Sequence, residues 1–292
     1  MRIAYLASQR TLPGAPVRRA DAFEHDQMMA CLDAAGPGRG ITFEAVSWDD
    51  PDARWHDFDA AMIGTTWDYP QRTDAFLATL RCIETATTLV NSAATAAWNY
   101  RKTYLRDLAA RGAPVIPTVW ADHLTADGAG AAAKRLGTGQ LVVKRQVGSN
   151  SEGQMRLGPG DAVPTVTAPV MIQPYRAAIA TEGELSFIFI AGRFSHALQK
   201  HPAAGDYRVQ SDYGGREAVY QPTDADCGLA EQIVRLVDPL PFYARVDMLR
   251  APHGGLELME LELIEPFLFP LQGPALGDRI AQAFAALPAA AS

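Results

Sequence analysis

The residues best suited to chemistry are three carboxylates near the carboxyl end of the chain. Asp247 lies in one short apolar segment, residues 242–249, and Glu260 and Glu262 lie in the next, residues 256–264. A Pro-His-Gly-Gly sequence separates the two segments, which predicts a β-hairpin. We therefore expect these acids on adjacent antiparallel strands, where apolar side chains are more usual.

The alternation of side chains along a strand decides which of these residues meet. Glu260 and Glu262 share one face of their strand, and Met259, Leu261 and Leu263 share the other. Carboxylates gathered on one face repel each other and lose hydration, a cost that a bound cation offsets. Oxygen-only ligands favour Mg²⁺, with Mn²⁺ as the alternative, over Zn²⁺. The competing interpretation, a solvated face of an amphipathic strand, stays open on this stretch alone.

Composition restricts the class of protein. A chain of 292 residues with 48% hydrophobic and 20% charged residues is typical of a soluble globular protein of one to three domains. The net charge of -7 and the lack of a basic run argue against a nucleic-acid partner. The first apolar run is too short for a signal peptide or a membrane span, so we expect a cytoplasmic protein. The three scattered cysteines predict no disulfide and no metal site.

The first third of the chain predicts a small α/β domain with a largely parallel sheet. The periodicity indicates strands at residues 2–7, 41–48, 60–64 and 89–91, and helices at 21–36 and 73–84. Asp21 and Glu24 resemble a capping box at the start of the first helix.

The loop after the third of these strands is a candidate substrate site, because parallel sheets bind ligands beyond the carboxyl ends of their strands. This loop carries Trp67, Asp68, Tyr69 and Arg72. The alternative is a capped loop around a packed aromatic side chain.

The rest of the chain predicts alternating helices and strands. Helices are expected at 97–111, in an alanine-rich segment ending near 136, at 224–237 and at 276–287, and strands at 115–120, 141–145, 170–175, 184–191 and 193–200. Ala191 and Gly192 join the last two strands in a hairpin. Pro174 suggests that its strand is an edge strand or a crossing between lobes.

Lys144 interrupts an otherwise apolar strand and precedes a loop of small residues, 148–153. Backbone N–H groups in such a loop can turn toward an anion, although a simple hairpin turn is the alternative. The loop has no G-x-x-x-x-G-K-[ST] pattern, so it is not a Walker A loop.

The order of these features resembles the ATP-grasp superfamily, and most closely its bacterial glutathione synthetase branch. Along the chain come Lys102, Lys144 with its small-residue loop, the Gln-Pro-Tyr sequence at 173–175, Arg208 before a Gly-Gly pair, and Asp247 before a Glu-x-Glu sequence. The resemblance covers nearly the whole chain. It implies an α/β fold with an N-terminal parallel domain, residues 1–94, and two ATP-grasp lobes, residues 95–174 and 175–292, with ATP held between the lobes.

The resemblance also implies a role for each site residue. Lys102, Lys144 and the loop residues Ser149, Asn150 and Ser151 would hold the ATP phosphates; Gln173, Pro174 and Tyr175 would line the adenine pocket, with main-chain hydrogen bonds to the base; and Glu184 would bind the ribose. Asp247, Glu260 and Glu262 would bind Mg²⁺, and Lys200 and Arg208 would act on the transferring phosphoryl group. For each lysine, a solvated surface charge is the alternative.

The activity implied is that of an ATP-dependent ligase. The enzyme would activate a substrate carboxylate as an acyl phosphate for attack by a nitrogen nucleophile and release ADP and phosphate. The chain departs from the glutathione synthetase pattern at two positions. Glu262 replaces the usual asparagine, which should preserve metal binding, and Ser186 replaces an arginine of the phosphate or substrate clamp, so we do not expect glutathione as the product. Length, the TTWDYPQR loop and the MELELIEP ending resemble a subgroup of antibiotic-pathway ligases that close a ring within one amino-acid-like molecule.

Three other functions stay open. An intermolecular peptide or amide ligase would use the same residues, and a non-catalytic nucleotide-binding regulator could share the fold. A hydrolase with a carboxylate acid/base pair is disfavoured by the lysines expected around the acids. Members of the superfamily are commonly dimers or tetramers, which implies a homo-oligomer.

Overall fold

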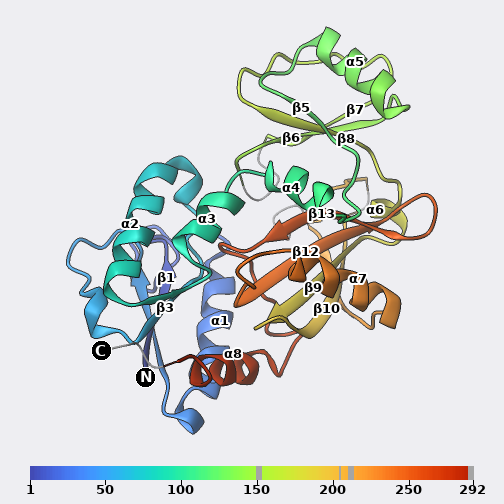
Figure 1. Cartoon of the computed structure of the whole chain (residues 1–292). Coiled ribbons are helices and arrows are strands. Elements are labelled where there is room, and N and C mark those ends of the chain that lie inside the picture. Colours follow the sequence, from blue (N-terminus) through green and yellow to red (C-terminus); the bar gives the residue numbers. More distant parts are fainter. Residues whose placement is uncertain (149–152, 204, 210–213, 289–292) are drawn as a thin grey trace.

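The structure is a computed structural model that describes residues 1–148, 153–203, 205–209 and 214–288. Its named strands form three separate sheets (Figure 1). Ser149, Asn150 and Ser151, expected at the phosphates, lie outside the described residues. Within the described ranges, no helix has the length and apolar character needed to cross a bilayer.

The first sheet is parallel, as the sequence predicts, with strand order β2-β1-β3-β4. Its strands are β1 (Arg2–Ala7), β2 (Thr42–Ser47), β3 (Ala60–Ile63) and β4 (Thr88–Val90). Alternate residues of β1 serve two cores: Ile3 and Tyr5 pack toward α1 (Ala22–Ala35), and Ala4 and Leu6 pack toward α2 (Thr73–Ala86). Both faces of the sheet are therefore buried, which suits continuous apolar strands.

The second sheet is antiparallel, with strand order β5-β8-β6-β7. It consists of β5 (Val119–Ala121), β6 (Leu141–Arg145), β7 (Met155–Leu157) and β8 (Val170–Pro174). The alanine-rich helix α5 (Ala126–Leu136) covers it at the top of Figure 1. Because β8 lies inside the sheet, the expectation that Pro174 marks an edge strand is wrong; Pro174 is the last residue of β8 and needs no further ladder bond.

The third sheet is antiparallel and carries the predicted acids. Its order is β11-β10-β9-β12-β13, formed by β9 (Glu184–Ile190), β10 (Arg193–His201), β11 (Arg216–Tyr220), β12 (Tyr243–Arg250) and β13 (Leu256–Glu262). Helices α6 (Ala178–Thr181) and α7 (Asp224–Arg235) pack near it. Both predicted hairpins, β9-β10 and β12-β13, are present.

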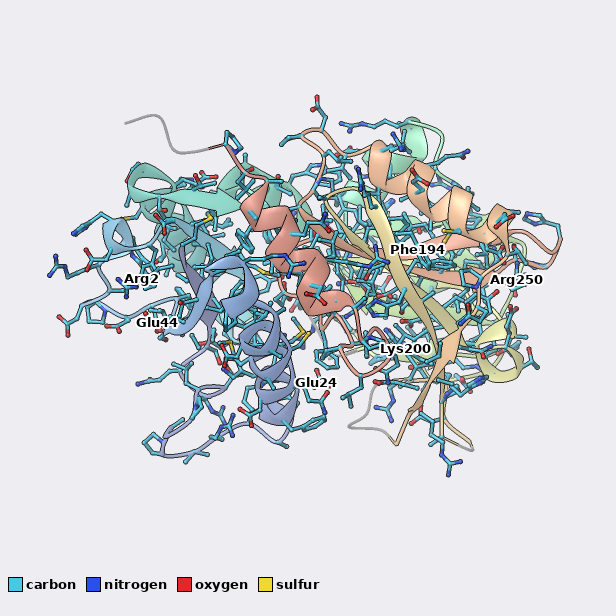
Figure 2. The ribbon with its side chains drawn as sticks, turned by 90° about the horizontal axis from the view of Figure 1, so that it is seen from below. Arg2, Glu24, Glu44, Phe194, Lys200 and Arg250 are labelled. Atoms are coloured by element: carbon cyan, nitrogen blue, oxygen red, sulfur yellow. The ribbon has the colours of Figure 1, made fainter. Side chains whose placement is uncertain are left out.

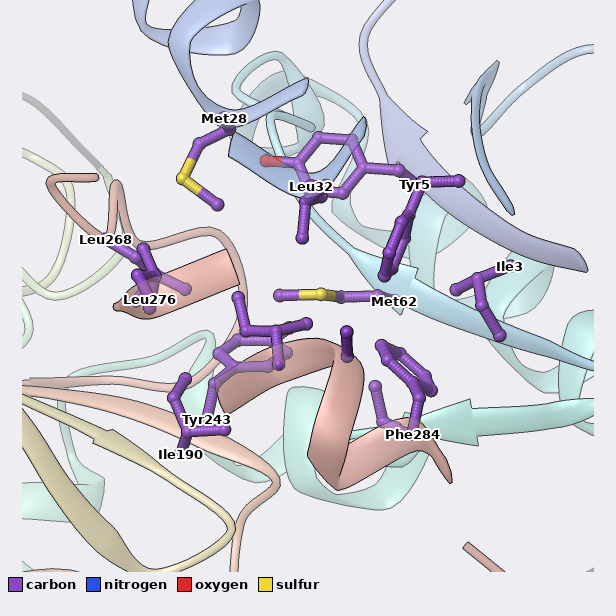
Figure 3. Packing of buried hydrophobic residues seen from close by; sticks show 14 of the residues in the cluster. Ile3, Tyr5, Met28, Leu32, Met62, Ile190, Tyr243, Leu268, Leu276 and Phe284 are labelled. Carbon is purple, nitrogen blue, oxygen red and sulfur yellow. The ribbon is translucent and has the colours of Figure 1, made fainter. Parts of the chain in front are cut away.

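The carboxyl-terminal helix α8 (Leu276–Ala285) joins the third sheet to the first. It lies against α1, as Figure 2 shows. Figure 3 shows the shared core, which contains Met28 and Leu32 of α1, Leu276 and Phe284 of α8, and Ile190 and Tyr243 of the third sheet. This packing holds the amino-terminal domain against the sheet that carries the acids.

Three local expectations differ from the structure. The helix expected at 97–111 is two helices, α3 (Ala93–Asn99) and α4 (Tyr104–Ala110), because the N–H of Lys102 between them donates to Gln146 O at 2.8 Å. Of the strand expected at 115–120, only the end belongs to β5, whereas Val115 bridges to β13. Asp21 makes no capping hydrogen bond and pairs with Arg19 instead, so the capping box is absent.

Candidate active site

One pocket brings most of the predicted site residues together from all parts of the fold. Trp67 and Tyr69 reach it from the first domain, Lys144 and Tyr175 from the second sheet, and Asp247 from the third. The other predicted residues that line it are Lys102, Gln173, Pro174, Glu184, Lys200, Arg208, Glu260 and Glu262. Residues far apart in the sequence therefore form one cleft.

The three carboxylates share a face, and this face is the pocket wall. Asp247 pairs with Glu260 across the β12-β13 ladder, and Arg245 pairs with Glu262. The Asp247 side chain is only 2% exposed, and those of Glu260 and Glu262 are 21% and 27% exposed. The structure therefore excludes the alternative in which these acids point into bulk water.

A β-bulge changes the alternation beside the acids. The ladder shifts register between Asp247 and Met248, where Leu258 and Glu260 are the successive partners, so Met259 is the extra residue. Leu261 and Leu263 pack on the far face, as expected, but Met259 packs with the apolar residues of the pocket. The expectation that Met259 shares their face is wrong.

Each carboxylate is paired with a cation. Arg245 donates from Nε to both oxygens of Asp247 at 3.1 Å, from Nη2 to Glu262, and from Nη1 to Phe267 O at 3.1 Å. Lys200 Nζ lies 3.6 Å from Asp247. Burial alone would raise the pKa of Asp247, but Arg245 and Lys200 hold it below the usual value. Asp247 is therefore ionised in the folded protein.

The acids fit a hard divalent cation by their donor chemistry. Asp247, Glu260 and Glu262 offer only oxygen, and they lie on adjacent positions of one face. Among the described residues, however, no three acids, histidines or cysteines form a preassembled metal site. The arginine and lysine partners occupy the carboxylates instead, so a bound cation would share or replace these ion pairs.

Two lysines lie where an anion would be held. Lys102 Nζ contacts Glu260 Oε1 at 2.6 Å and donates to Gly148 O at 2.9 Å. The ammonium group of Lys144 makes no hydrogen bond or ion pair with a described residue. Burial lowers the pKa of Lys144, and the neighbouring Lys102 lowers it further. A cation that is poorly solvated and unpaired favours an anionic ligand such as a phosphate.

The expected adenine side of the pocket is apolar. Ile116, Ile179, Leu249 and Met259 cluster there and pack against Tyr175. The N–H of Tyr175 donates to Gln140 O at 2.8 Å, and Gln173 donates from its side chain to Thr118 at 3.0 Å. The Tyr175 main-chain donor is thus already used, which limits the hydrogen bonds expected for a base.

Glu184 lies among the charged residues and not apart from them. Its carboxylate accepts from Lys200 Nζ at 2.7 Å and lies near Ser186, whose hydroxyl donates to Asp247 at 2.5 Å. Burial raises the pKa of Glu184 against the opposing effect of Lys200. Glu184 is therefore engaged by Lys200 within the pocket, and the ribose role that the resemblance implies stays a prediction.

Of the four candidate substrate residues in the loop after β3, only Trp67 and Tyr69 line the pocket. Trp67 donates from Nε1 to Glu265 O at 3.1 Å. Asp68 instead accepts from Trp48 at 2.9 Å, and Arg72 pairs with Asp49 at 2.5 Å and lies over the Trp48 ring. Asp68 and Arg72 do not line the pocket, and their side chains instead bind Trp48 and Asp49.

Several pocket residues were not predicted from the sequence. Arg245 lies two positions before Asp247 on the same strand face, a spacing that could have identified it. Burial raises the pKa of both Glu24 and Glu265 to about 7. The carboxylate of Glu24, on α1, makes no hydrogen bond or ion pair with a described residue. Arg208, which was predicted, lines the pocket and is held by Asp206 at 2.8 Å.

The fold matches solved ATP-grasp enzymes over nearly its full length. The ATP-grasp ligase PsnB, solved with a phosphomimetic variant of its minimal precursor, Mg and ADP, superposes with a TM-score of 0.65 at 16% identity, covering 96% of this chain and 98% of PsnB. The D-alanine–D-alanine ligase of Bacillus anthracis, solved with ATP, gives 0.67 at 14% identity, covering 97% and 95%. The fold is that of the ATP-grasp ligases, and the chain is an ATP-dependent, ADP-forming enzyme of this class.

A narrower set of matches identifies the family. The family model "D-cycloserine synthetase DcsG, N-terminal domain" matches residues 3–91. The cycloserine biosynthesis protein DcsG of Streptomyces lavendulae is 30% identical over 256 residues, 78% of this chain and 83% of that protein. The crystal structure of D-cycloserine synthetase DcsG superposes with a TM-score of 0.81 at 25% identity, covering 98% and 99% of the two chains. The chain belongs to the DcsG family.

Proposed function

We propose that this enzyme makes D-cycloserine by closing a ring within one molecule of O-ureido-D-serine. The observation that supports this most is the pocket itself, where Lys102, Lys144 and the acid face of the third sheet meet Trp67 and Tyr69 of the domain that the DcsG family model matches. The proposed phosphate-binding side of the pocket, with Lys102 and Lys144, is thus continuous with the proposed substrate-binding side, with Trp67 and Tyr69. The substrate is a small amino acid, which suits a site walled by charged and aromatic side chains.

The reaction starts with the substrate carboxylate. An oxygen of this carboxylate attacks the γ-phosphorus of ATP, ADP leaves, and an acyl phosphate forms. The ureido nitrogen bonded to oxygen then attacks the acyl carbon, loses its proton and expels phosphate, which closes the five-membered ring. Hydrolytic loss of the carbamoyl group from that nitrogen gives D-cycloserine.

The chain contributes mainly positioning and positive charge. Lys102 and Lys144 hold the phosphates of ATP, whereas Lys200, Arg208 and Arg245 neutralise the charge that develops on the transferring group. Arg208 must leave Asp206, which holds it in this structure, to reach that group. The unpaired carboxylate of Glu24 is suited to the ammonium group of the amino-acid substrate.

Asp247, Glu260 and Glu262 are the residues that would hold Mg²⁺. The metal, when bound, neutralises phosphate oxygens and makes the γ-phosphorus more electrophilic; Mn²⁺ shares this oxygen preference. Relatives of the fold, such as PsnB, were solved with Mg and ADP.

We further propose that the chain is divided into three domains, residues 1–94, 95–174 and 175–292. We also propose that the protein is cytoplasmic and forms a homo-oligomer.

Product analysis tests this function. The protein is incubated with Mg²⁺, ATP and O-ureido-D-serine, ADP is measured by a coupled assay, and D-cycloserine is identified by mass spectrometry. The control is D-serine plus hydroxyurea, which supplies carboxylate and nucleophile on separate molecules. We expect ADP and D-cycloserine only with O-ureido-D-serine. ADP formation only with the two-component mixture would contradict ring closure and favour an intermolecular ligase. No ADP formation with either substrate would favour the non-catalytic nucleotide-binding regulator.

A further inference from the structure

Phe269 has a backbone conformation that bulky residues rarely adopt. Its φ is 52°, in the left-handed region, and its side chain is only 4% exposed. Its carbonyl accepts hydrogen bonds from the N–H groups of Gln272 and Gly273, both at 3.1 Å. A Cβ atom at Gly273 would lie 2.2 Å from the His196 ring. The turn is therefore packed closely enough to maintain an unfavourable conformation at Phe269.

The Phe269 ring lies beneath two pocket cations. Lys200 Nζ is 5.1 Å from the ring centroid, and Arg245 Cζ is 5.7 Å from it. Phe267 packs edge-on against the same ring at 4.6 Å and accepts from Arg245 through its carbonyl. Both cations are at least nine-tenths buried, at 6% and 9% exposure. Cation–π attraction is strongest for desolvated cations of this kind.

Lys200 and Arg245 repel each other because both are positively charged and both are buried away from water. Glu184 and Asp247 attract them from one side, since Lys200 bonds Glu184 and Arg245 bonds Asp247. Asp247 belongs to the proposed metal site and Glu184 lies beside it in the same pocket, so the attraction of these carboxylates for the cations would change when Mg²⁺ and ATP bind. The Phe269 ring is a neutral partner. Its attraction for the two cations stays the same when a metal ion or a phosphate binds to the carboxylates or leaves them.

We propose that Phe269 is a positioning residue that holds Lys200 and Arg245 side by side toward the transferring phosphoryl group. The inference rests on the proposed ligase function, because it gives the two cations their task. A positioning role also accounts for the backbone conformation of Phe269. The left-handed backbone brings the aromatic ring under the two cations, whereas a side chain that only filled the core would not need this conformation.

Three variants separate positioning from packing. Phe269→Leu removes the π face while keeping an apolar side chain, Phe269→Tyr restores the face, and Phe284→Leu makes the same change in the shared core away from both cations. Two readouts are compared: the kcat for ADP release with O-ureido-D-serine, and the acetylation of Lys200 by acetic anhydride in the absence of ligands, followed by mass spectrometry.

We expect Phe269→Leu to lower kcat by roughly 30-fold, the equivalent of about 2 kcal/mol, to leave KM for ATP unchanged and to increase Lys200 acetylation. Phe269→Tyr should restore both readouts, and Phe284→Leu should change neither. Phe269→Leu behaving like Phe284→Leu in both readouts would overturn the proposal. If the wild type does not turn over O-ureido-D-serine, the proposed function fails, and the acetylation pattern alone then supports or overturns the positioning role.

Discussion

Replacing Lys144 by Met should weaken ATP binding without destabilising the free protein. Lys144 has no partner in the described part of the chain, and burial disfavours its charged form. In the free enzyme this charge contributes no ion pair that the substitution would remove. Met fills a similar volume without the charge, so we expect a melting temperature equal to or above that of the wild type.

The loss of ATP affinity follows from the bond that Lys144 would make to phosphate. A hydrogen bond to a charged group contributes about 1.5 to 3 kcal/mol, which corresponds to roughly 10- to 150-fold in Kd. Isothermal titration of a non-hydrolysable ATP analogue with Mg²⁺ measures this, and a thermal melt without ligand measures stability. Lys134→Met, on the exposed surface of α5, is the matched control.

Three results would refute this reasoning about Lys144. Unchanged affinity for the analogue would show that the unpaired charge does not face the phosphates. A melting temperature several degrees lower in Lys144→Met alone would show that the lysine has a stabilising role in the free protein. Equal losses of affinity in both lysine variants would point to long-range attraction and not to a phosphate contact.

Three further predictions concern other parts of the molecule. Arg208→Ala should reduce turnover by on the order of 10³-fold while ATP affinity is largely kept; stopped-assay kinetics with analogue titration check this, and wild-type turnover would remove Arg208 from the mechanism. Asn91→Ala should cost about 3 kcal/mol in urea unfolding, because the Asn91 side chain bonds three backbone groups at the start of β12 and just beyond the end of β13; a loss near zero would contradict this. Burial lowers the pKa of His25 from 6.5 to about 4. Between these two pH values His25 stays neutral in the folded protein, whereas in the unfolded chain it takes up a proton. Stability should therefore fall as the pH drops through this window, by about 1.3 kcal/mol between about pH 7.5 and 5.5 for this residue, and His25→Asn should show a correspondingly smaller fall.

The pattern of the sequence predicts the parts of the fold that depend on local periodicity. The parallel first sheet, both hairpins and the shared face of Asp247 and Glu260 follow from alternation and turn residues. Lys144 is also recognisable from the sequence, because burying a charge in an otherwise apolar strand costs free energy unless the charge binds a partner or a ligand. These inferences use neighbours in sequence or the simple geometry of one hairpin.

The errors occur where distant segments decide the local structure. The helix expected at 97–111 is interrupted because the carbonyl of Gln146, the residue after β6, binds the N–H of Lys102. Met259 changes faces because of a bulge that alternation cannot reveal. Asp68 and Arg72 turn away from the pocket because Trp48 and Asp49, on a neighbouring segment, bind them.

Arg245 and Phe269 show the same limit within the site. Arg245 reads as an ordinary strand arginine until Glu262 is placed beside it by the ladder. Phe269 reads as a core residue in an apolar stretch, and its relation to Lys200 exists only once β10 and the segment after β13 are packed together. The contacts of Phe269 with the cations therefore required the tertiary structure, whereas the sequence and its resemblance already indicated the three acids and most of the cations, namely Lys102, Lys144, Lys200 and Arg208.

The account depends on the carboxylates of β13 holding the metal that accompanies ATP. The most direct measurement is ADP release by the Glu260→Gln, Glu262→Gln double variant at saturating Mg²⁺, ATP and O-ureido-D-serine, with circular dichroism confirming the fold. We expect turnover to fall by roughly 10³-fold or more, because the charge stabilisation contributed by a bound metal is worth several kcal/mol. Turnover equal to that of the wild type would contradict the account.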